Sequence, residues 1–179
     1  ADLDGDGQPE VLTFAIRRAY AYDGRTGLAL ASGATDPGYD LGFSIPYGVM
    51  RTELAPLGGG RKAVVAATNN SYDASINSRA LFVMTFDRAR PVGERLKLEW
   101  RRGVAQLATD RHPFPARLSS DLDGDGTPEV TSSFTEGGRT RSYVFELLTG
   151  VVRSAVDDEQ VVAVLQLSPA ERPTLVTSG

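Results

Sequence analysis

Near its start the chain reads Asp2-Leu3-Asp4-Gly5-Asp6-Gly7-Gln8-Pro9-Glu10-Val11, and further along it reads Asp121-Leu122-Asp123-Gly124-Asp125-Gly126-Thr127-Pro128-Glu129-Val130. The two stretches differ only at the seventh position. Each has aspartates at positions one, three and five, a glycine at position six and a glutamate at position nine. Alternating carboxylates on a tightly turned backbone point toward one centre, and the glycine permits the turn. This pattern predicts the first half of a calcium-binding loop, twice.

We therefore predict two Ca²⁺ sites, one in each copy. The seventh residue of each copy would offer its backbone carbonyl, and the glutamate would bind directly or through water. The expected metal ligands are Asp2, Asp4, Asp6, Gln8 and Glu10 in the first loop, and Asp121, Asp123, Asp125, Thr127 and Glu129 in the second. The alternative interpretation is an acidic hairpin turn that binds no metal.

The residues after each loop exclude an EF-hand. An EF-hand needs a bidentate glutamate at position twelve and flanking helices, but Thr13 and Ser132 stand at that position. The following residues are rich in β-branched and aromatic types, which favours strands. Each loop should therefore join two strands.

On these loops the chain resembles the FG-GAP / VCBS repeat family, whose Asp-x-Asp-x-Asp-Gly loops lie in β-propeller blades, as in the integrin α-subunit head. The resemblance implies that each loop connects the first and second strands of a blade. The expected fold class is all-β, a partial β-propeller of about three to three and a half four-stranded antiparallel blades. Propellers close with about 4–8 blades, so we expect an arc of a longer chain.

The pattern of apolar runs and turn residues predicts thirteen strands in a single domain over residues 1–179, with blades near 1–32, 47–100, 116–156 and, in part, 161–179. The expected strands are 10–16, 19–23, 28–32, 47–54, 63–68, 80–86, 95–100, 116–120, 129–135, 142–148, 151–156, 161–167 and 173–177. Residues 56–62 would form the same hairpin without carboxylates. The apolar runs 63–67 and 80–86 should be buried on both faces. Residues 157–167 could instead begin a helix, because acidic residues stand in its first turn.

Composition and charge argue against two classes of function, nucleic-acid binding and membrane insertion. The 179 residues carry a net charge of −4, are 41% hydrophobic and include no cysteine. The arginines are scattered, so we expect no nucleic-acid partner. No apolar run approaches the roughly 20 residues of a membrane helix, so we expect no membrane insertion. The chain opens one residue before a predicted ligand, which suggests a fragment.

The resemblance places the turns after the second strands on the face opposite the calcium loops. Arginines beside aromatic residues suit carboxylated sugars or acidic peptides. The candidate ligand-binding residues are Arg17, Arg18, Tyr72, Arg139 and Arg141, within a wider set of Tyr39, Phe43, Tyr47, Arg101, Arg102, Arg111 and His112. The alternative is that these are solvated loop charges and aromatic residues covering sheet edges.

We identify no catalytic residues. His112 is the only histidine, and no Gly-x-Ser-x-Gly occurs. We expect a calcium-binding propeller segment with a recognition, adhesion or scaffold role rather than an enzyme, and self-association through open blade faces. Loops of about 10⁻⁴ M affinity fill only at extracellular calcium levels, which favours an extracellular, cell-surface or periplasmic location. The alternative is the propeller of a secreted polysaccharide lyase, to which rhamnogalacturonan lyases look similar.

Overall fold

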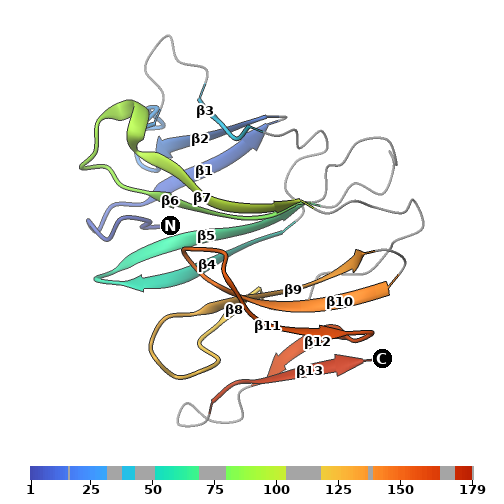
Figure 1. The fold of residues 1–179 in the computed structure, drawn as a ribbon. Helices are drawn as coiled ribbons and strands as arrows, with labels where there is room; N and C mark the ends of the chain where they lie inside the picture. The colour runs from blue at the N-terminus through green and yellow to red at the C-terminus, as the bar shows by residue number, and fades with distance from the viewer. Residues whose placement is uncertain are drawn as a thin grey trace.

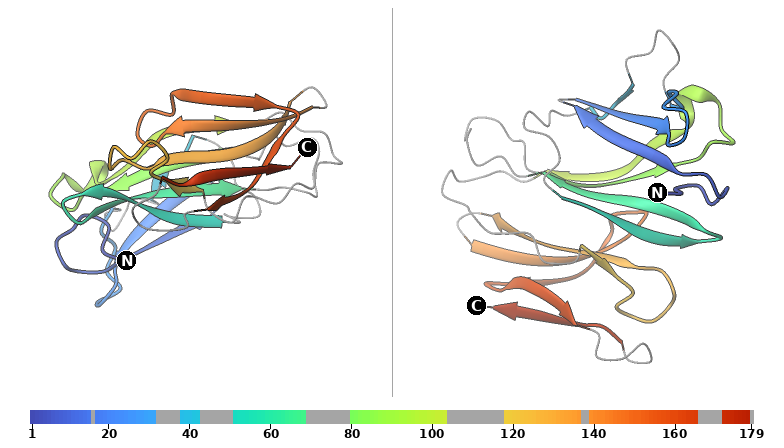
Figure 2. Two further views of the ribbon diagram at one scale, coloured as in Figure 1. Left: turned by 90° about the horizontal axis from the view of Figure 1, so that it is seen from below. Right: turned by 180° about the vertical axis from the view of Figure 1, so that it is seen from behind.

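The computed structural model describes residues 1–15, 17–31, 38–42, 51–68, 80–103, 118–136, 139–165 and 172–178. These residues form antiparallel sheets and one short 3₁₀ helix, η1 (Val92–Glu94). The sheets follow one another in a stack, in chain order from the N-terminus to the C-terminus (Figures 1 and 2). The all-β, antiparallel character expected from the sequence is confirmed.

Each sheet is a meander in which consecutive strands pair. The first sheet contains β1 (Glu10–Ala15), β2 (Arg18–Asp23) and β3 (Tyr39–Asp40), and the second contains β4 (Arg51–Gly58), β5 (Arg61–Thr68), β6 (Ala80–Phe86) and β7 (Leu96–Gly103). The third contains β8 (Ser119–Ser120), β9 (Glu129–Glu136), β10 (Arg139–Glu146) and β11 (Val152–Asp157), and the fourth contains β12 (Gln160–Leu165) and β13 (Thr174–Ser178). Two sheets are therefore four-stranded, as predicted.

The second sheet is buried on both faces. In β6, Phe82 and Met84 point into a core shared with the first sheet, whereas Leu81 and Val83 point into a core shared with the third. Strand β5 alternates in the same way. Successive side chains of a strand face opposite sides, so an uninterrupted apolar run is what a two-sided position requires. The predicted burial of 63–67 and 80–86 is confirmed.

A more polar contact joins the third and fourth sheets. The amide of Val161 donates to the hydroxyls of Ser133 and Ser142 at 2.9 and 3.1 Å, and the Ser142 hydroxyl lies 2.6 Å from the carbonyl oxygen of Glu159. Val161 itself is buried. Small hydroxyl side chains let the two sheets approach closely. Residues 160–165 form a strand, so the helical alternative for this segment is wrong.

Three strand predictions need correction. Residues 28–31 form no strand: Ala29 makes an isolated bridge to Tyr22, and β3 pairs with the other end of β2, so two short segments share that edge. Strand β4 runs on to Gly58 through Pro56, which an edge strand tolerates. Strand β10 covers 139–146 rather than 142–148, because the chain turns after Glu146.

The predicted strand 80–86 is confirmed at both ends as β6. Apart from β4, the ends of the other predicted strands that form, including 95–100, differ from the prediction by at most three residues. Parts of the predicted strands 10–16, 28–32, 47–54, 116–120 and 161–167 lie outside the described residues.

Candidate metal centre

The two acidic loops lie at the same edge of the stack, on the left in Figure 1. The second loop joins β8 to β9, where Ser120 pairs with Glu129. The first loop leads into β1, and Ala1 takes the place of Ser120. The Ala1 amine donates to the Glu10 carbonyl at 2.8 Å, and the Glu10 amide donates to the Ala1 carbonyl at 2.6 Å. Both loops are therefore closed at their base by the same residue pairing.

In the first loop, backbone amides hold the carboxylates in place. The two oxygens of Asp2 accept from Gly5 at 2.8 Å and from Gly7 at 3.1 Å. Asp4 accepts from the Asp6 amide at 3.2 Å, and Asp6 accepts from the Gln8 amide at 2.7 Å. The Leu3 amide donates to Glu10 Oε2 at 2.8 Å. The turn needs left-handed backbone at both glycines, with φ of 81° and 83°.

The second loop repeats this geometry bond by bond. Asp121 accepts from Gly124 at 2.7 Å and from Gly126 at 3.0 Å. The amides of Asp125 and Thr127 donate to the carboxylates two residues before them, at 3.1 and 2.7 Å. The Leu122 amide donates to Glu129 Oε2 at 2.8 Å. Each distance matches its counterpart in the first loop within about 0.1 Å, so the shared sequence fixes one loop conformation.

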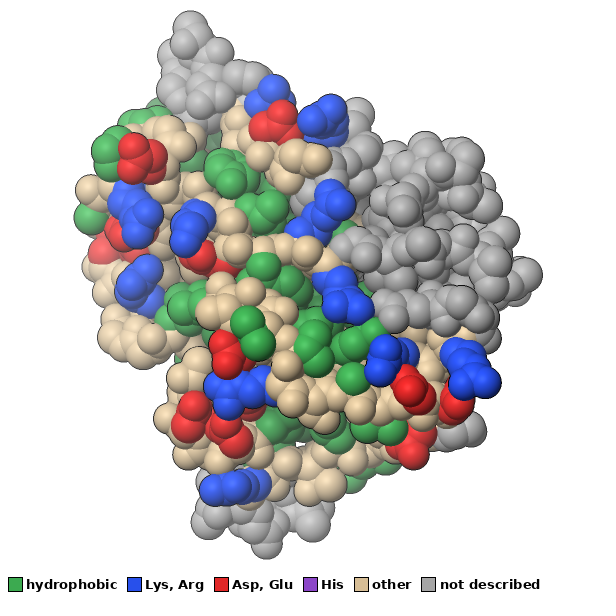
Figure 3. Space-filling view, viewed as in Figure 1, with side chains coloured by type: hydrophobic (Ala, Val, Ile, Leu, Met, Phe, Trp, Pro, Cys, Tyr) green, Lys and Arg blue, Asp and Glu red, His purple; other side chains and the backbone are tan. Residues whose placement is uncertain are grey.

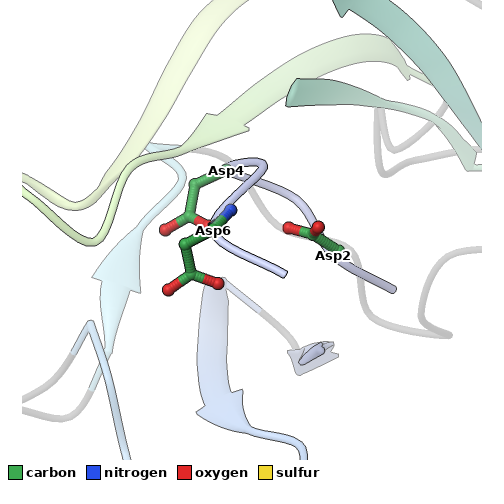
Figure 4. A group of neighbouring side chains, drawn as sticks. All are labelled: Asp2, Asp4 and Asp6. Carbon is green, nitrogen blue, oxygen red and sulfur yellow. Dashed lines mark hydrogen bonds between the residues drawn. The ribbon is translucent and has the colours of Figure 1, made fainter. Parts of the chain in front are cut away.

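Carboxylate oxygens gather in both loops. In the first, one oxygen each from Asp2, Asp4 and Asp6 lies within 4.8 Å of the others. Figure 4 shows Asp4 and Asp6 side by side, with Asp2 pointing toward them from across the turn. In the second, the group is Asp121, Asp123 and Glu129, within the same limit. Such oxygen clusters could hold a divalent cation, because hard cations prefer oxygen ligands.

A cation from the neighbouring sheet enters the first loop. Arg88, on the connection between β6 and β7, places Nη2 2.5 Å from Glu10 Oε1, Nη1 3.4 Å from Asp23 Oδ2 and Nε 3.5 Å from Asp6 Oδ2. Its amide also donates to Asp4 at 3.0 Å. The Glu10 side chain is completely buried. Arg88 therefore neutralises a carboxylate that would otherwise be buried without a partner.

The hairpin between β4 and β5 supports the first loop from the second sheet. The amide of Lys62 donates to the Leu3 carbonyl at 2.9 Å, and its Nζ donates to the Asp2 carbonyl at 2.8 Å. The hairpin backbone approaches so closely that a β-carbon at Gly5 would lie 2.6 Å from the Gly59 carbonyl oxygen. This is the carboxylate-free hairpin expected from 56–62, and it serves as a platform for its neighbour.

The second loop has a different electrostatic environment. Arg153 of β11 lies at its rim, with Nη1 3.3 Å from Asp123 Oδ2 and Nε 3.0 Å from Glu146 Oε1. Among the described residues, Glu129 accepts only the Leu122 amide. Burial raises the pKa of Glu129, and the carboxylates of Asp123 and Asp125 raise it further against the lowering effect of that amide. Among the described residues, this buried acid in the second loop therefore has no cationic partner.

The predicted ligand-binding arginines lie at the opposite ends of the strands, and each has a local partner. Arg17 lies 3.6 Å from Asp40, and Arg18 donates to the Gly38 carbonyl at 2.8 Å. Arg141 pairs with Asp157 at 2.6 Å and Arg139 lies 4.0 Å from Asp158. Tyr72, Phe43, Tyr47, Arg111 and His112 lie outside the described residues.

Sequence reasoning did not find Arg88, Asp23 or Glu146 as parts of these sites. Asp23 pairs with Glu10 across β1 and β2, and Glu146 pairs with Glu129 across β9 and β10. The signal that could have found these acids is the shared corner after each strand, Asp23-Gly-Arg-Thr-Gly27 and Glu146-Leu-Leu-Thr-Gly150. No local pattern points to Arg88.

Comparison with models of known protein families, with curated proteins and with solved structures gives no match. No helix among the described residues is long and apolar enough to span a membrane.

Proposed function

We propose that this chain is a calcium-binding segment of a β-propeller of the FG-GAP / VCBS type, with a recognition, adhesion or scaffold role. The proposal rests on one observation. Two loops far apart in sequence, on different sheets, share the same five bonds from backbone amides to carboxylates and each gather three carboxylates within 4.8 Å. A loop that served only as a turn would not need four acids.

The charge of the loops supports a divalent cation as their ligand. Each loop concentrates three aspartates and one glutamate on a turn of nine residues. Calcium accepts 6–8 oxygen ligands in flexible geometry, which suits carboxylates on an exposed turn. With a Kd of about 10⁻⁴ M and about 1 mM calcium, each occupied loop would add roughly 1.4 kcal/mol to stability. Such affinity favours an extracellular, cell-surface or periplasmic location.

The arginines at the other end of the strands support a recognition role. The side chains of Arg17 and Arg139 are 58% and 78% exposed, so their guanidinium groups remain accessible despite nearby aspartates. Guanidinium groups bind carboxylates in a bidentate manner. We therefore propose an acidic peptide or an anionic polysaccharide as the partner. Self-association through the outer sheets is a further proposal, and the propeller of a secreted polysaccharide lyase is the alternative function.

Calorimetric titration with CaCl₂ tests the calcium proposal. We expect saturable binding that Asp123→Ala and Asp4→Ala each reduce by one site. Asp157→Ala is a matched control, because Asp157 is an exposed carboxylate outside both loops. If neither loop variant changes the stoichiometry, or if the wild-type protein releases no binding heat at millimolar calcium, the proposal is wrong.

A further inference from the structure

Three carboxylates surround the Arg88 guanidinium group beside the first loop, and three carboxylates stand at the equivalent positions beside the second loop. Asp6, Glu10 and Asp23 contact the guanidinium group. By loop position and strand register, their counterparts are Asp125, Glu129 and Glu146: Glu10 pairs with Asp23, as Glu129 pairs with Glu146. The second loop therefore repeats an arginine-binding arrangement, although Arg88 itself belongs to another part of the chain.

A cavity of about 150 Å³ lies at this place in the second loop. Three acids line it, Asp125, Glu129 and Glu146, together with Thr127, Leu147, Leu148, Thr149 and the arginine Arg153. The acids that contact Arg88 beside the first loop thus have equivalents beside the second loop that line a cavity. Acids facing a cavity repel one another unless a cation joins them.

Arg153 does not fill this role. Arg153 lines the cavity, but its side chain is 45% exposed and pairs with Glu146 and Asp123 rather than with Glu129. No described arginine contacts Glu129, which is buried at 4% exposure. In the first loop, by contrast, the Glu10 contact is the shortest that Arg88 makes. Among the described residues, Glu129 therefore has no guanidinium partner equivalent to the one that Glu10 has.

We propose that this cavity binds an arginine side chain carried by a partner polypeptide. The topology indicates how the arginine would arrive. Arg88 enters the first loop from the connection between the third and fourth strands of the next sheet. The sheet next to the second loop, β12–β13, is two-stranded in the described part of the chain. A partner that adds two strands to the edge of β13 would place its own connecting turn at the cavity, by β-strand addition.

The only tryptophan, Trp100, packs against the turn that lines this cavity. Trp100 Nε1 donates to the Leu147 carbonyl at 2.7 Å, and a β-carbon at Gly150 would lie 2.7 Å from the indole ring. The ring therefore packs against the corner that lines the cavity. Binding of a guanidinium group there should change the intrinsic fluorescence of the full chain.

The experiment titrates the protein in EDTA with acetyl-arginine methylamide, with acetyl-lysine methylamide as the charge-matched control. We expect saturable binding of the arginine compound and at least about tenfold weaker binding of the lysine compound, because lysine lacks the planar fork. Glu146→Gln should weaken arginine binding about tenfold or more and leave calcium binding unchanged. Equal affinity for the two compounds, or no saturable binding, would overturn the proposal.

Two variants separate this proposal from the others. Asp121→Asn should remove calcium binding at the second loop and retain arginine binding, because Asp121 does not line the cavity. If Asp121→Asn keeps full calcium binding, that result counts only against the calcium proposal, whereas loss of arginine binding in this variant counts only against the arginine proposal. Arg153→Gln should bind the arginine compound at least as tightly as the wild-type protein. If only that variant binds, Arg153 is the resident cation and the cavity takes no partner arginine.

Discussion

The loops at 2–10 and 121–129 have the same internal geometry and different neighbours. Their backbone-to-carboxylate bonds agree one by one. The first loop holds Arg88 against its buried glutamate, whereas in the second loop the equivalent glutamate has one amide as its side-chain partner among the described residues. Figure 3 shows acidic and basic side chains side by side along this edge of the molecule. A repeated sequence can thus fix a conformation without fixing its charge balance.

The two loops differ in whether a described residue places a cation beside their buried glutamate. In the first, a guanidinium group supplied by the fold neutralises Glu10 and Asp23, so folding and charge compensation are coupled. In the second, no described residue supplies a cation to Glu129.

The largest effect should follow removal of Arg88. Arg88→Ala leaves Glu10 buried and unpaired beside Asp6 and Asp23, and breaking a buried pair in this way costs about 3–5 kcal/mol. We expect that loss in urea unfolding in EDTA, partly recovered by calcium. Arg153→Ala is the matched control, because its exposed ion pairs are worth only about 0.2–1 kcal/mol. Equal losses in the two variants would show that the loops do not differ as described.

Neutralising the two glutamates should have opposite effects on stability in EDTA. Glu10→Gln removes the charged partner of Arg88 and should destabilise the protein by about 1.5–3 kcal/mol. Glu129→Gln keeps an acceptor for the Leu122 amide and removes a buried charge surrounded by aspartates, so the melting temperature should rise. Differential scanning calorimetry of both variants measures the contrast. A fall in both melting temperatures would contradict it.

Calcium should bind the second loop more tightly than the first. A positive charge among the carboxylates of the first loop opposes a divalent cation there, and about 1.4 kcal/mol of such opposition gives a tenfold difference in Kd. Calorimetry on Asp4→Asn, which leaves the second loop intact, should report the tighter site. Calorimetry on Asp123→Asn should report the weaker one. The reverse order would show that Arg88 does not compete with the ion.

Local features of the fold could be predicted because local residues determine them. The alternating aspartates and glycines give the loop conformation, and the runs in β5 and β6 give burial on both faces. Prediction failed where distant contacts decide. Leu147 is buried in the core although it belongs to a turn, so its apolar character extended the predicted strand too far. Pro56 ended a predicted strand that its edge position allows to continue.

Only the loop carboxylates of the candidate site could be predicted from the sequence. The carboxylates of each loop lie within nine residues and could be read directly from the sequence. Arg88 is separated from Glu10 by 78 residues and reaches it only because the second sheet stacks on the first. Neither spacing nor composition encodes that contact, and the charge difference between the loops depends on it.

The smallest expected effect is on the pH dependence of stability. Glu129 beside the second loop and Asp23 beside the first should contribute to it with opposite signs. Burial and neighbouring aspartates raise the pKa of Glu129, so the folded protein holds this proton more tightly than the unfolded chain does. Stability from this group is present below the unfolded pKa of about 4.3 and is lost as the pH rises through the folded pKa. Backbone amides of Thr26 and Arg25 lower the pKa of Asp23, whose contribution is instead lost as the pH falls through its folded value.

Urea unfolding in EDTA across the acidic range measures both contributions. Glu129→Gln should remove the loss of unfolding free energy that occurs as the pH rises through the folded pKa of Glu129. Asp23→Asn should remove the loss that occurs as the pH falls through the folded pKa of Asp23. If the curve of Glu129→Gln runs parallel to that of the wild-type protein, Glu129 is already compensated, and the difference between the two loops disappears.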